Sequence, residues 1–539
     1  MAVRDGRSVR LPGLGAPLLG ACLALAAPAA VRGETLADAI ELAYQSNPSL
    51  QSARAQLRAL DESYVQAHAG FRPSATAQVE PVYQEQQQLS FFGTRQTTFS
   101  NLGTASVTLS QPLYHGGATT WAVEAAADDI RASREQLRAT EGQVLQQVVQ
   151  AYVDVRRDQQ VLAAYEGEVG ILQSQLDDAI ARKNAGEVTR TDVEQSQTQL
   201  DSARANLSLA QGQLQVSRAE YAAVVGQNPG DLAPPPDLPG LPLSIDEAFD
   251  AALTDSPTLR EAEEAQHASS ARISEARAAY SPSVQLQAQF GYSGPLTPFR
   301  ARNENRGLTV GAIVQIPLLT AGLSESNVRK AVDEDDSARI GVEGARRAVV
   351  QAVSNAWNTA LASRASAQSD THAVSSARQY FADTQEEYRV GQRSTLDVLI
   401  AEQTLRGAEV AEAQAEHDAY LSQAALLNAL GRLQAVNLVK DIPLYDPAAA
   451  FRRVRNRGAT PWEEAVEDLD ALGAPPANHE RPLIAPALDP APALLPATPL
   501  PADARPETAI PTAPRPGTTS PATPPGLGVD RGAPYTPPR

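Results

Sequence analysis

Cysteine is almost missing from this sequence. The 539 residues include one, Cys22, which excludes an intrachain disulfide and any zinc or iron–sulfur site built on cysteine ligands. Six scattered histidines argue against a dedicated metal site. Aromatic residues make up only 5% of the chain and the mean hydropathy is −0.29, which excludes a bundle of membrane-spanning helices. A membrane β-barrel stays compatible with these values, because its strands alternate and contain no long apolar run.

Basic residues and catalytic motifs are also scarce. Lys and Arg total 45 against 63 Asp and Glu, and the net charge of −18 opposes a nucleic-acid partner, which needs a basic face for phosphates. No Walker loop, dinucleotide fingerprint or HExxH motif is present. His115-Gly116-Gly117 is similar to part of an oxyanion loop, but no nucleophile motif accompanies it, and it is interpreted as a turn. The sequence therefore predicts no enzyme, no cofactor and no metal.

The first 33 residues have the pattern of a secretory signal peptide. Three arginines lie among the first ten residues, Leu11–Ala27 is apolar or small, and Ala27-Pro28-Ala29 fits an A-x-A cleavage site. Leu19-Gly20-Ala21-Cys22 offers a second interpretation, a lipobox whose cysteine becomes lipidated. Residues 23–31 stay apolar, which favours ordinary cleavage, but the sequence leaves both open. Either way, the mature chain leaves the cytosol.

The rest of the chain repeats itself once. Residues 36–74 match 245–283 at an offset of 209, and the match resumes from Pro112 at an offset of 205. The matched pairs include Pro48/Pro257, Pro73/Pro282, Pro112/Pro317, Gly117/Gly322, Gly186/Gly391 and Gly226/Gly431. Because proline and glycine pairs keep this register, we expect two structural repeats, 34–233 and 244–438, joined by a Pro-rich linker at 234–243.

Each repeat is predicted to contain two β-strands. Apolar and polar residues alternate in four segments of roughly ten residues, which are 74–84, 103–113, 283–293 and 307–317. A tilted strand of that length crosses a bilayer, and the Gln, Ser and Thr on the alternate face suit a water-filled lumen. A half-buried sheet in a soluble protein gives the same alternation.

Long proline-free stretches follow the strands. Residues 118–185 contain no proline, and as one helix they would span about 100 Å. The predicted helical hairpins cover 118–226 and 323–431, and helices of this length indicate a coiled coil or the wall of a tube. Residues 439–475 are expected to form an equatorial or peripheral segment. Prolines are concentrated in the remainder, 476–539, which is predicted to be a disordered tail.

The number of predicted strands bears on the number of chains. Four strands do not close a barrel, and an open sheet edge is not tolerated in lipid. Chains must therefore pool their strands. Two chains would supply about eight strands, whose barrel is filled by its own side chains, whereas three would supply about twelve and leave room for a channel. A lumen that passes anything thus favours a homotrimer.

The order and spacing of these features carry a family resemblance. The strand entries read Phe71-Arg72-Pro73 and Tyr280-Ser281-Pro282, and the strand exits read Gln111-Pro112-Leu113 and Ile316-Pro317-Leu318. The hairpin turns lie at 184–193 and 388–398. Together with the duplication, these motifs resemble the TolC-type outer-membrane efflux channel family over about residues 35–432.

The resemblance implies a fold and a function. In such proteins three chains form one 12-stranded β-barrel in the outer membrane of a Gram-negative bacterium, continued by a long α-helical coiled-coil tunnel across the periplasm. The expected fold class is therefore an internally duplicated, mixed α/β membrane protein with four strands per chain. The expected function is a passive conduit for export in a tripartite efflux or type I secretion system. Its expected partners are outer-membrane lipid, a periplasmic adaptor (membrane fusion) protein and an inner-membrane ABC or proton-driven transporter.

The resemblance also implies that the two hairpin tips form a periplasmic gate. The tip turns are built around Gly186 and Gly391. Tyr388, Arg393 and Asp192 match positions whose bonds between helices hold the family's tunnel closed. We therefore expect these three side chains to link the helices at the tip.

A fourth tip residue, Asp397, matches an acidic ring at the narrowest point of the family's tunnel. The residue types alone allow another role, because Thr189-x-x-Asp192 and Ser394-x-x-Asp397 are both capping boxes that open a helix. Both roles can coexist. The family can carry a second acidic residue one helical turn later, but Ile400 stands at that position, so no double ring is expected.

A periplasmic coiled-coil adaptor, or an envelope scaffold without a pore, is the alternative function. An adaptor would have one helical hairpin flanked by a split lipoyl-like β domain and no duplication, whereas this sequence has a duplication and paired strands. The sequence identifies neither the transported substrate nor the inner-membrane transporter. It also leaves open the resting state of the gate and the role of the tail.

Overall fold

The computed structural model of the chain describes residues 34–89, 91, 93–295, 305–440 and 442–477. Three expectations fall outside them, namely the signal peptide at 1–33, the lipidation of Cys22 and residues 478–539 of the predicted tail. The described residues all belong to one unit of the chain, Met1–Glu480.

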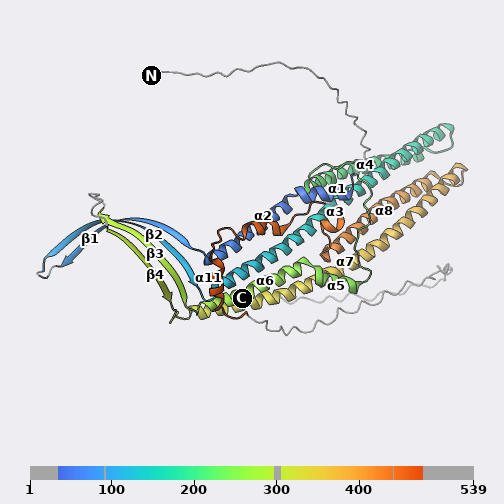
Figure 1. The fold of residues 1–539 in the computed structure, drawn as a ribbon. Coiled ribbons are helices and arrows are strands. Elements are labelled where there is room, and N and C mark those ends of the chain that lie inside the picture. The colour runs from blue at the N-terminus through green and yellow to red at the C-terminus, as the bar shows by residue number, and fades with distance from the viewer. Residues whose placement is uncertain (1–33, 90, 92, 296–304, 441, 478–539) are drawn as a thin grey trace, which may run out of the picture. The chain divides into compact units, whose positions relative to one another are not determined.

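In the first half two strands stand between a pair of shorter helices and a pair of longer ones (Figure 1). In order the elements are α1 (Leu36–Ser46), α2 (Pro48–His68), the short 3-10 turn η1 (Ala69–Phe71), β1 (Ser74–Leu89), β2 (Arg95–Tyr114), α3 (Ala118–Ala185) and α4 (Arg190–Val225). Asn47 begins α2, since its side chain accepts hydrogen bonds from the amides of Ser49 and Leu50 and Pro48 takes the first helical position.

The second half has the same order of main elements. They are α5 (Ile245–Asp255), α6 (Pro257–Ala278), β3 (Ser283–Pro295), β4 (Asn305–Gln315), α7 (Leu323–Arg389) and α8 (Thr395–Ala429). Three short helices complete the described chain, α9 (Ala435–Leu438), α10 (Pro447–Val454) and α11 (Glu463–Ala471).

The four strands form one antiparallel sheet in the order β1-β2-β3-β4. β3 and β4 lie within two residues of the predicted segments, whereas β1 and β2 are longer than 74–84 and 103–113. Their pairing continues from Glu85 opposite Phe99 to Leu89 opposite Arg95, through polar residues that do not alternate. Among the described residues β1 pairs only with β2 and β4 only with β3, so both outer strands have a free edge.

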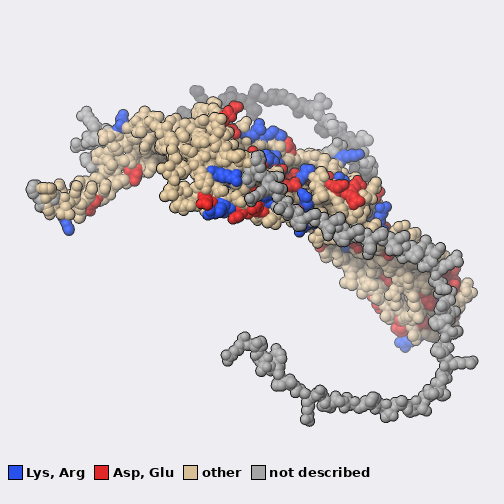
Figure 2. All heavy atoms as spheres, turned by 90° about the horizontal axis from the view of Figure 1, so that it is seen from below, with Lys and Arg blue, Asp and Glu red and all other residues tan. Residues whose placement is uncertain are grey.

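The register of the sheet separates apolar from polar side chains. One row across the four strands reads Ala77, Val107, Phe290, Leu308, and the row beside it reads Thr76, Thr108, Gln289, Thr309. Because neighbouring residues of a strand point to opposite faces, one face of the sheet is apolar and the other is polar. The apolar face is uncovered, since Val79 is 78% and Leu308 70% exposed. On the side shown in Figure 2, Lys, Arg, Asp and Glu gather over the helices and leave the sheet almost bare.

The long helices form two antiparallel hairpins. α3 packs on α4 and α7 packs on α8, and the hairpins meet where α3 runs beside α8. The 68 residues of α3 correspond to about 100 Å of helix, as the absence of proline predicts. Among the described helices, none is long and apolar enough to cross a membrane.

The main hydrophobic core surrounds the middle of α3. Tyr152 and Tyr221 are fully buried there, in a core that includes leucines and valines of α1, α2, α4 and α8 and alanines of α5. The Tyr152 hydroxyl lies 2.9 and 2.6 Å from the carbonyl oxygens of Glu34 and Ala233, which ties the start of the described chain to the residue that precedes the linker. A second, smaller cluster lies near the hairpin ends and contains Leu172, Leu176, Leu200, Ala203 and Leu399.

The segment after α9 covers one side of the first half. α10 packs against α2, and α11 packs against η1, β2 and the start of α3. Val466 of α11 shares a small core with Phe71 and Val123. The predicted peripheral segment, 439–475, thus ends at the junction between the strands and α3.

Candidate functional site

The two hairpin tips are tight turns built around glycine. Gly186 and Gly391 have φ values of 81° and 76°, in the left-handed region that side-chain-bearing residues rarely adopt. A Cβ at either glycine would meet nothing within 4 Å, so the backbone conformation, and not crowding, explains the residue type. The two turns end α3 and follow α7, as the sequence predicts for these glycines.

Asp192 and Asp397 both cap the helix that follows their turn. Asp192 Oδ2 accepts from the Thr189 amide and hydroxyl, both at 2.8 Å, and Asp397 Oδ2 accepts from the Ser394 amide and hydroxyl at 2.9 and 2.8 Å. The amide of each aspartate donates back to the hydroxyl, which completes a capping box. Asp192 makes no described bond to another helix, so the link between helices expected of it is not seen within the chain.

The neighbours of Asp397 stabilise the ionised form of its carboxylate. The Ser394 amide and hydroxyl, and more weakly the nearby Arg393, hold the pKa of this carboxyl below its usual range. Asp397 therefore stays ionised at any pH above the ordinary aspartate range. A permanent negative charge one turn into α8 is what an acidic ring requires.

Arg393 pairs with a residue of its own hairpin. Its Nε donates to Glu387 Oε2 at 2.7 Å, and this bond raises the pKa of Arg393 above its usual range. Both side chains are nearly half exposed, so this ion pair contributes little to stability. Arg393 thus links the end of α7 to the tip turn and makes no described contact with α3 or α4 within the chain.

Tyr388 makes the contact between hairpins at the tip. Its hydroxyl donates to Asp178 Oδ2 of α3 at 3.3 Å. The Arg182 guanidinium lies 4.5 Å from the centroid of the Tyr388 ring, and its Nε is 3.1 Å from Asp178 Oδ2. This tip cluster of Asp178, Arg182 and Tyr388 joins α3 to α7 by a hydrogen bond, a cation–π contact and an ion pair.

The family resemblance led us to expect Tyr388 to link helices at the tip, and it named neither Asp178 nor Arg182 as a partner. Asp178 and Arg182 are four residues apart, which puts them on one face of α3 near its end. This spacing in the sequence could have indicated an ion pair near the end of α3. In the part of the chain that the structure describes, no group of three or more His, Cys, Asp or Glu is arranged to hold a metal ion.

Known proteins share the sequence pattern of this chain. The model of the outer membrane efflux protein family matches residues 39–227 and 248–432. The outer membrane efflux protein BepC of Brucella suis is 32% identical over 428 residues, covering 79% of this chain and 92% of its own. The outer membrane protein TolC of Escherichia coli is 26% identical over 461 residues, covering 82% and 92%.

The fold comparison agrees. The structure of the outer membrane protein VceC of Vibrio cholerae superposes with a TM-score of 0.61 at 22% identity, covering 74% of this chain and 96% of that one. The predicted family, the outer-membrane location and the role in efflux are thereby confirmed, and these relatives give no support to the adaptor alternative. The chain belongs to the outer membrane efflux protein family.

Proposed function

We propose that three copies of this chain form one channel, a 12-stranded β-barrel continued by a tunnel of α-helical hairpins, which acts as a passive conduit and not as an enzyme. Substrate enters at the hairpin tips and leaves through the barrel. The observation that carries this proposal is the sheet, which has four strands, two free edges and one uncovered apolar face.

The free edges support a ring of copies. β1 runs away from the helices and β4 runs back toward them, so β4 of one copy and β1 of the next are antiparallel when placed side by side. Joining them continues the alternation of the sheet and leaves no unpaired edge in lipid. Three copies give about twelve strands, enough for an open lumen.

The composition of the two faces of the sheet indicates which face points outward to lipid and which points inward to the lumen. An outward apolar face suits lipid, and an inward face of Thr, Ser and Gln suits water. The rows through Val107 and Thr108 have these two compositions. The outer-membrane lipid is thus a partner of the apolar face.

We also propose that the two halves arose by duplication, with repeats at 34–233 and 244–438 and the linker at 234–243. The order of main elements is the same in both halves. Each of the three matched glycine pairs also has a positive φ at both positions. These are Gly117/Gly322, Gly186/Gly391 and Gly226/Gly431.

The hairpin tips are the proposed gate. The tip cluster of Asp178, Arg182 and Tyr388 holds the hairpins of one chain together, and Arg393 fixes the turn beside it. Threefold symmetry brings three copies of Asp397 toward the axis, where like charges attract cations. A conduit of this kind has no energy source, so its partners are a periplasmic adaptor and an inner-membrane ABC or proton-driven transporter.

Reconstitution of the purified protein in planar lipid bilayers tests the conduit. We expect discrete current steps that persist for seconds and rise when the tip contacts are weakened. Circular dichroism on the same preparation confirms that the helices are intact. A helical preparation that inserts and never conducts contradicts the proposal.

A further inference from the structure

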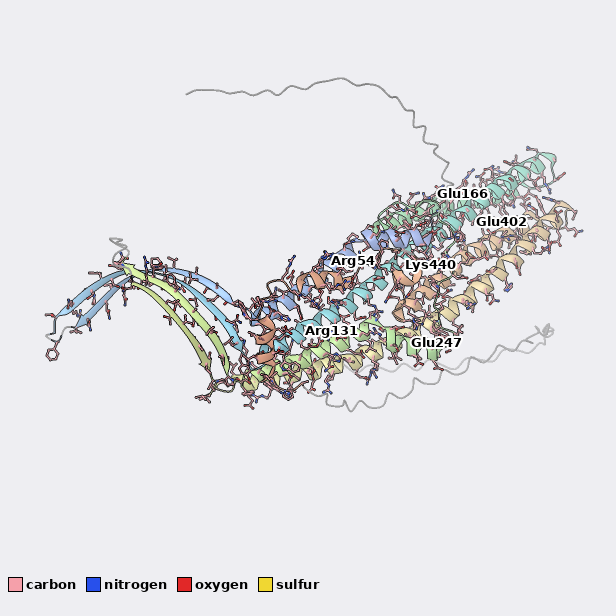
Figure 3. All side chains as sticks on the ribbon, viewed as in Figure 1. Arg54, Arg131, Glu166, Glu247, Glu402 and Lys440 are labelled. Carbon is pink, nitrogen blue, oxygen red and sulfur yellow. The ribbon has the colours of Figure 1, made fainter. Side chains whose placement is uncertain are left out.

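The seam where α3 of the first hairpin runs beside α8 of the second contains two groups of buried charges. One is centred on Glu402 and the other on His417, roughly 10 and 33 Å along α8 from its first residue. Neither belongs to the tip cluster. Figure 3 labels Glu402 where the two hairpins lie together.

The group nearer the tip holds more acid than base. Glu402 is 1% exposed and accepts from Arg406 Nε at 3.1 Å. Arg406 also contacts the carboxylate of Glu409 and donates from Nη1 to the Ala164 carbonyl of α3 at 3.0 Å. Arg378 of α7 reaches Glu409 at 3.4 Å from the exposed side. Arg406 is therefore shared between Glu402 and Glu409, and Arg378 supplies a second cation only to Glu409.

The facing residue of α3 adds a further carboxylate. Glu168 is 9% exposed, and its Oε2 has no hydrogen-bond partner among the described residues. Burial, followed by the charge of Glu168, raises the pKa of Glu402 to about 7, and Arg406 offsets this only in part. Burial also raises the pKa of Glu168, against a smaller opposing effect of Arg406. The pKa of about 7 means that Glu402 changes its charge near neutral pH.

The second group is an imidazole between two carboxylates. His417 Nε2 lies 2.9 Å from Asp154 Oδ1 of α3, and its Nδ1 lies 2.8 Å from Asp418 Oδ1 of α8. Arg157 of α3 pairs with Asp154 at 3.0 Å and also with Asp158.

The two carboxylates beside His417 favour the charged form of its imidazole. Asp158 Oδ2 accepts from the hydroxyl of Ser217 on α4 at 2.6 Å, whereas Asp154 Oδ1 is the α3 carboxylate oxygen close to His417. Burial lowers the pKa of His417, but the nearby carboxylates of Asp154 and Asp418 outweigh burial and raise it above the usual value, despite the opposing charge of Arg157.

We propose that the α3–α8 seam is a pH-sensitive latch between the two hairpins, closed most tightly when Glu402 and His417 both carry a proton. The proposal rests on the gate described above, because it names how contact between the hairpins is regulated. The seam lies farther from the hairpin tips than the tip cluster does, and it joins the same two hairpins.

The proton on Glu402 and the proton on His417 both strengthen the contact between the two hairpins. When Glu402 loses its proton, two buried carboxylates, Glu402 and Glu168, face each other across the seam and repel. When His417 loses its proton, the ion pair with Asp154 is lost. The raised pKa values mean that the latched arrangement binds these protons more tightly than a separated one does. The latch is therefore firm in mild acid and weakens as the pH rises through neutrality.

Single-channel recording between pH 5.5 and 8.5 tests the latch. For the natural chain we expect the open probability to rise about tenfold across this range, the factor that one pKa unit supplies. Glu402→Gln mimics the protonated acid and should keep the channel closed at pH 8. His417→Gln lacks the charged imidazole and should raise the open probability at pH 6. The double variant should lose the pH response.

Two further variants separate a specific effect at the seam from a general effect of removing a carboxylate. Glu386→Gln makes the same chemical change at an exposed residue near the tip, which pairs with Arg389, and should keep the natural pH response. Glu168→Gln removes the same repulsion from the α3 side, so it should act as Glu402→Gln does even if one of the two folds poorly.

The possible outcomes separate this inference from the proposed function. Channels that conduct with a current independent of pH overturn the latch and leave the conduit in place. An opposite sign for Glu168→Gln and Glu402→Gln also overturns it. A well-folded preparation that conducts at no pH overturns the conduit itself.

Discussion

Arg72 and Glu463, 391 positions apart in the chain, form a bidentate ion pair at the base of the sheet. Arg72 Nε lies 3.1 and 3.0 Å from the two carboxylate oxygens of Glu463, and Nη2 lies 2.9 Å from Oε1. The side chains are 10% and 11% exposed. Arg72 directly precedes Pro73 at the entry to β1, so this pair fixes α11 to the point where the helices become the sheet.

Glu463→Gln is expected to destabilise the protein by about 1–3 kcal/mol, because the buried Arg72 loses its charged partner. Burial alone would raise the pKa of Glu463, but the bonds from Arg72 and the Thr460 amide outweigh burial and lower it. The contribution of the pair is thus present at neutral pH and is lost as the pH falls through that lowered pKa. Thermal unfolding followed by circular dichroism measures the change. Glu464→Gln, an exposed neighbour, is the control, and equal midpoints for the two variants refute the role.

Asp470 is expected to act as the missing cap of α3. The helix begins after Gly117, which has no side chain, and Asp470 Oδ1 accepts from the amides of His115 and Gly117 at 2.6 and 3.0 Å. Asp470→Ala should cost about 1–2 kcal/mol of stability, the usual effect of removing a cap. Asp468→Ala on the same helix, at an exposed acid, should change little. Hydrogen exchange at the first turn of α3 should rise in the first variant alone, and protection equal to the control argues against the cap.

Tyr388→Phe is expected to favour the open gate. It removes the hydroxyl bond to Asp178 and keeps the ring over which Arg182 lies. A hydrogen bond contributes about 1 kcal/mol, which corresponds to a severalfold rise in open probability for each chain. Single-channel recording checks this, with Tyr165→Phe on α3 as a control of the same chemical change. Identical currents for both variants would leave Tyr388 without a role in closure.

Asp397→Asn is expected to reduce the preference for cations, because it removes the charge of the proposed ring. The effect should be constant between pH 5 and 8, since the lowered pKa of Asp397 keeps the carboxylate ionised there. Asp192→Asn is the matched control, because Asp192 makes the same capping box without a proposed place in the ring. Reversal potentials in a salt gradient measure the preference. Equal shifts in the two variants would show that Asp397 only caps its helix.

The sequence predicted those parts of the fold that depend on local periodicity. Alternation located four strands, the absence of proline located α3 and α7, and Gly186 and Gly391 located the tip turns. The ends of β1 and β2 were missed because residues 84–89 are mostly Gln and Glu, whose pairing depends on the partner strand.

Contacts between distant segments were the other part that sequence reasoning missed. The partners of Tyr388 lie about two hundred positions earlier in the chain, and Asp470 reaches the start of α3 from 353 positions away. No spacing rule connects such residues, because the packing of whole helices brings them together. The same holds for Glu168 and Glu402, which lie far apart in the sequence and become a pair only where α3 meets α8.

The number of chains in one particle shows whether the strands of several copies share one barrel. Native mass spectrometry of the protein extracted from outer membranes in a mild detergent measures it, and amphipol exchange provides a second environment. We expect a particle of three copies that dissociates only with loss of the sheet signal. A stable single copy with an intact sheet would contradict it, because four strands with two free edges would then have to persist without neighbours.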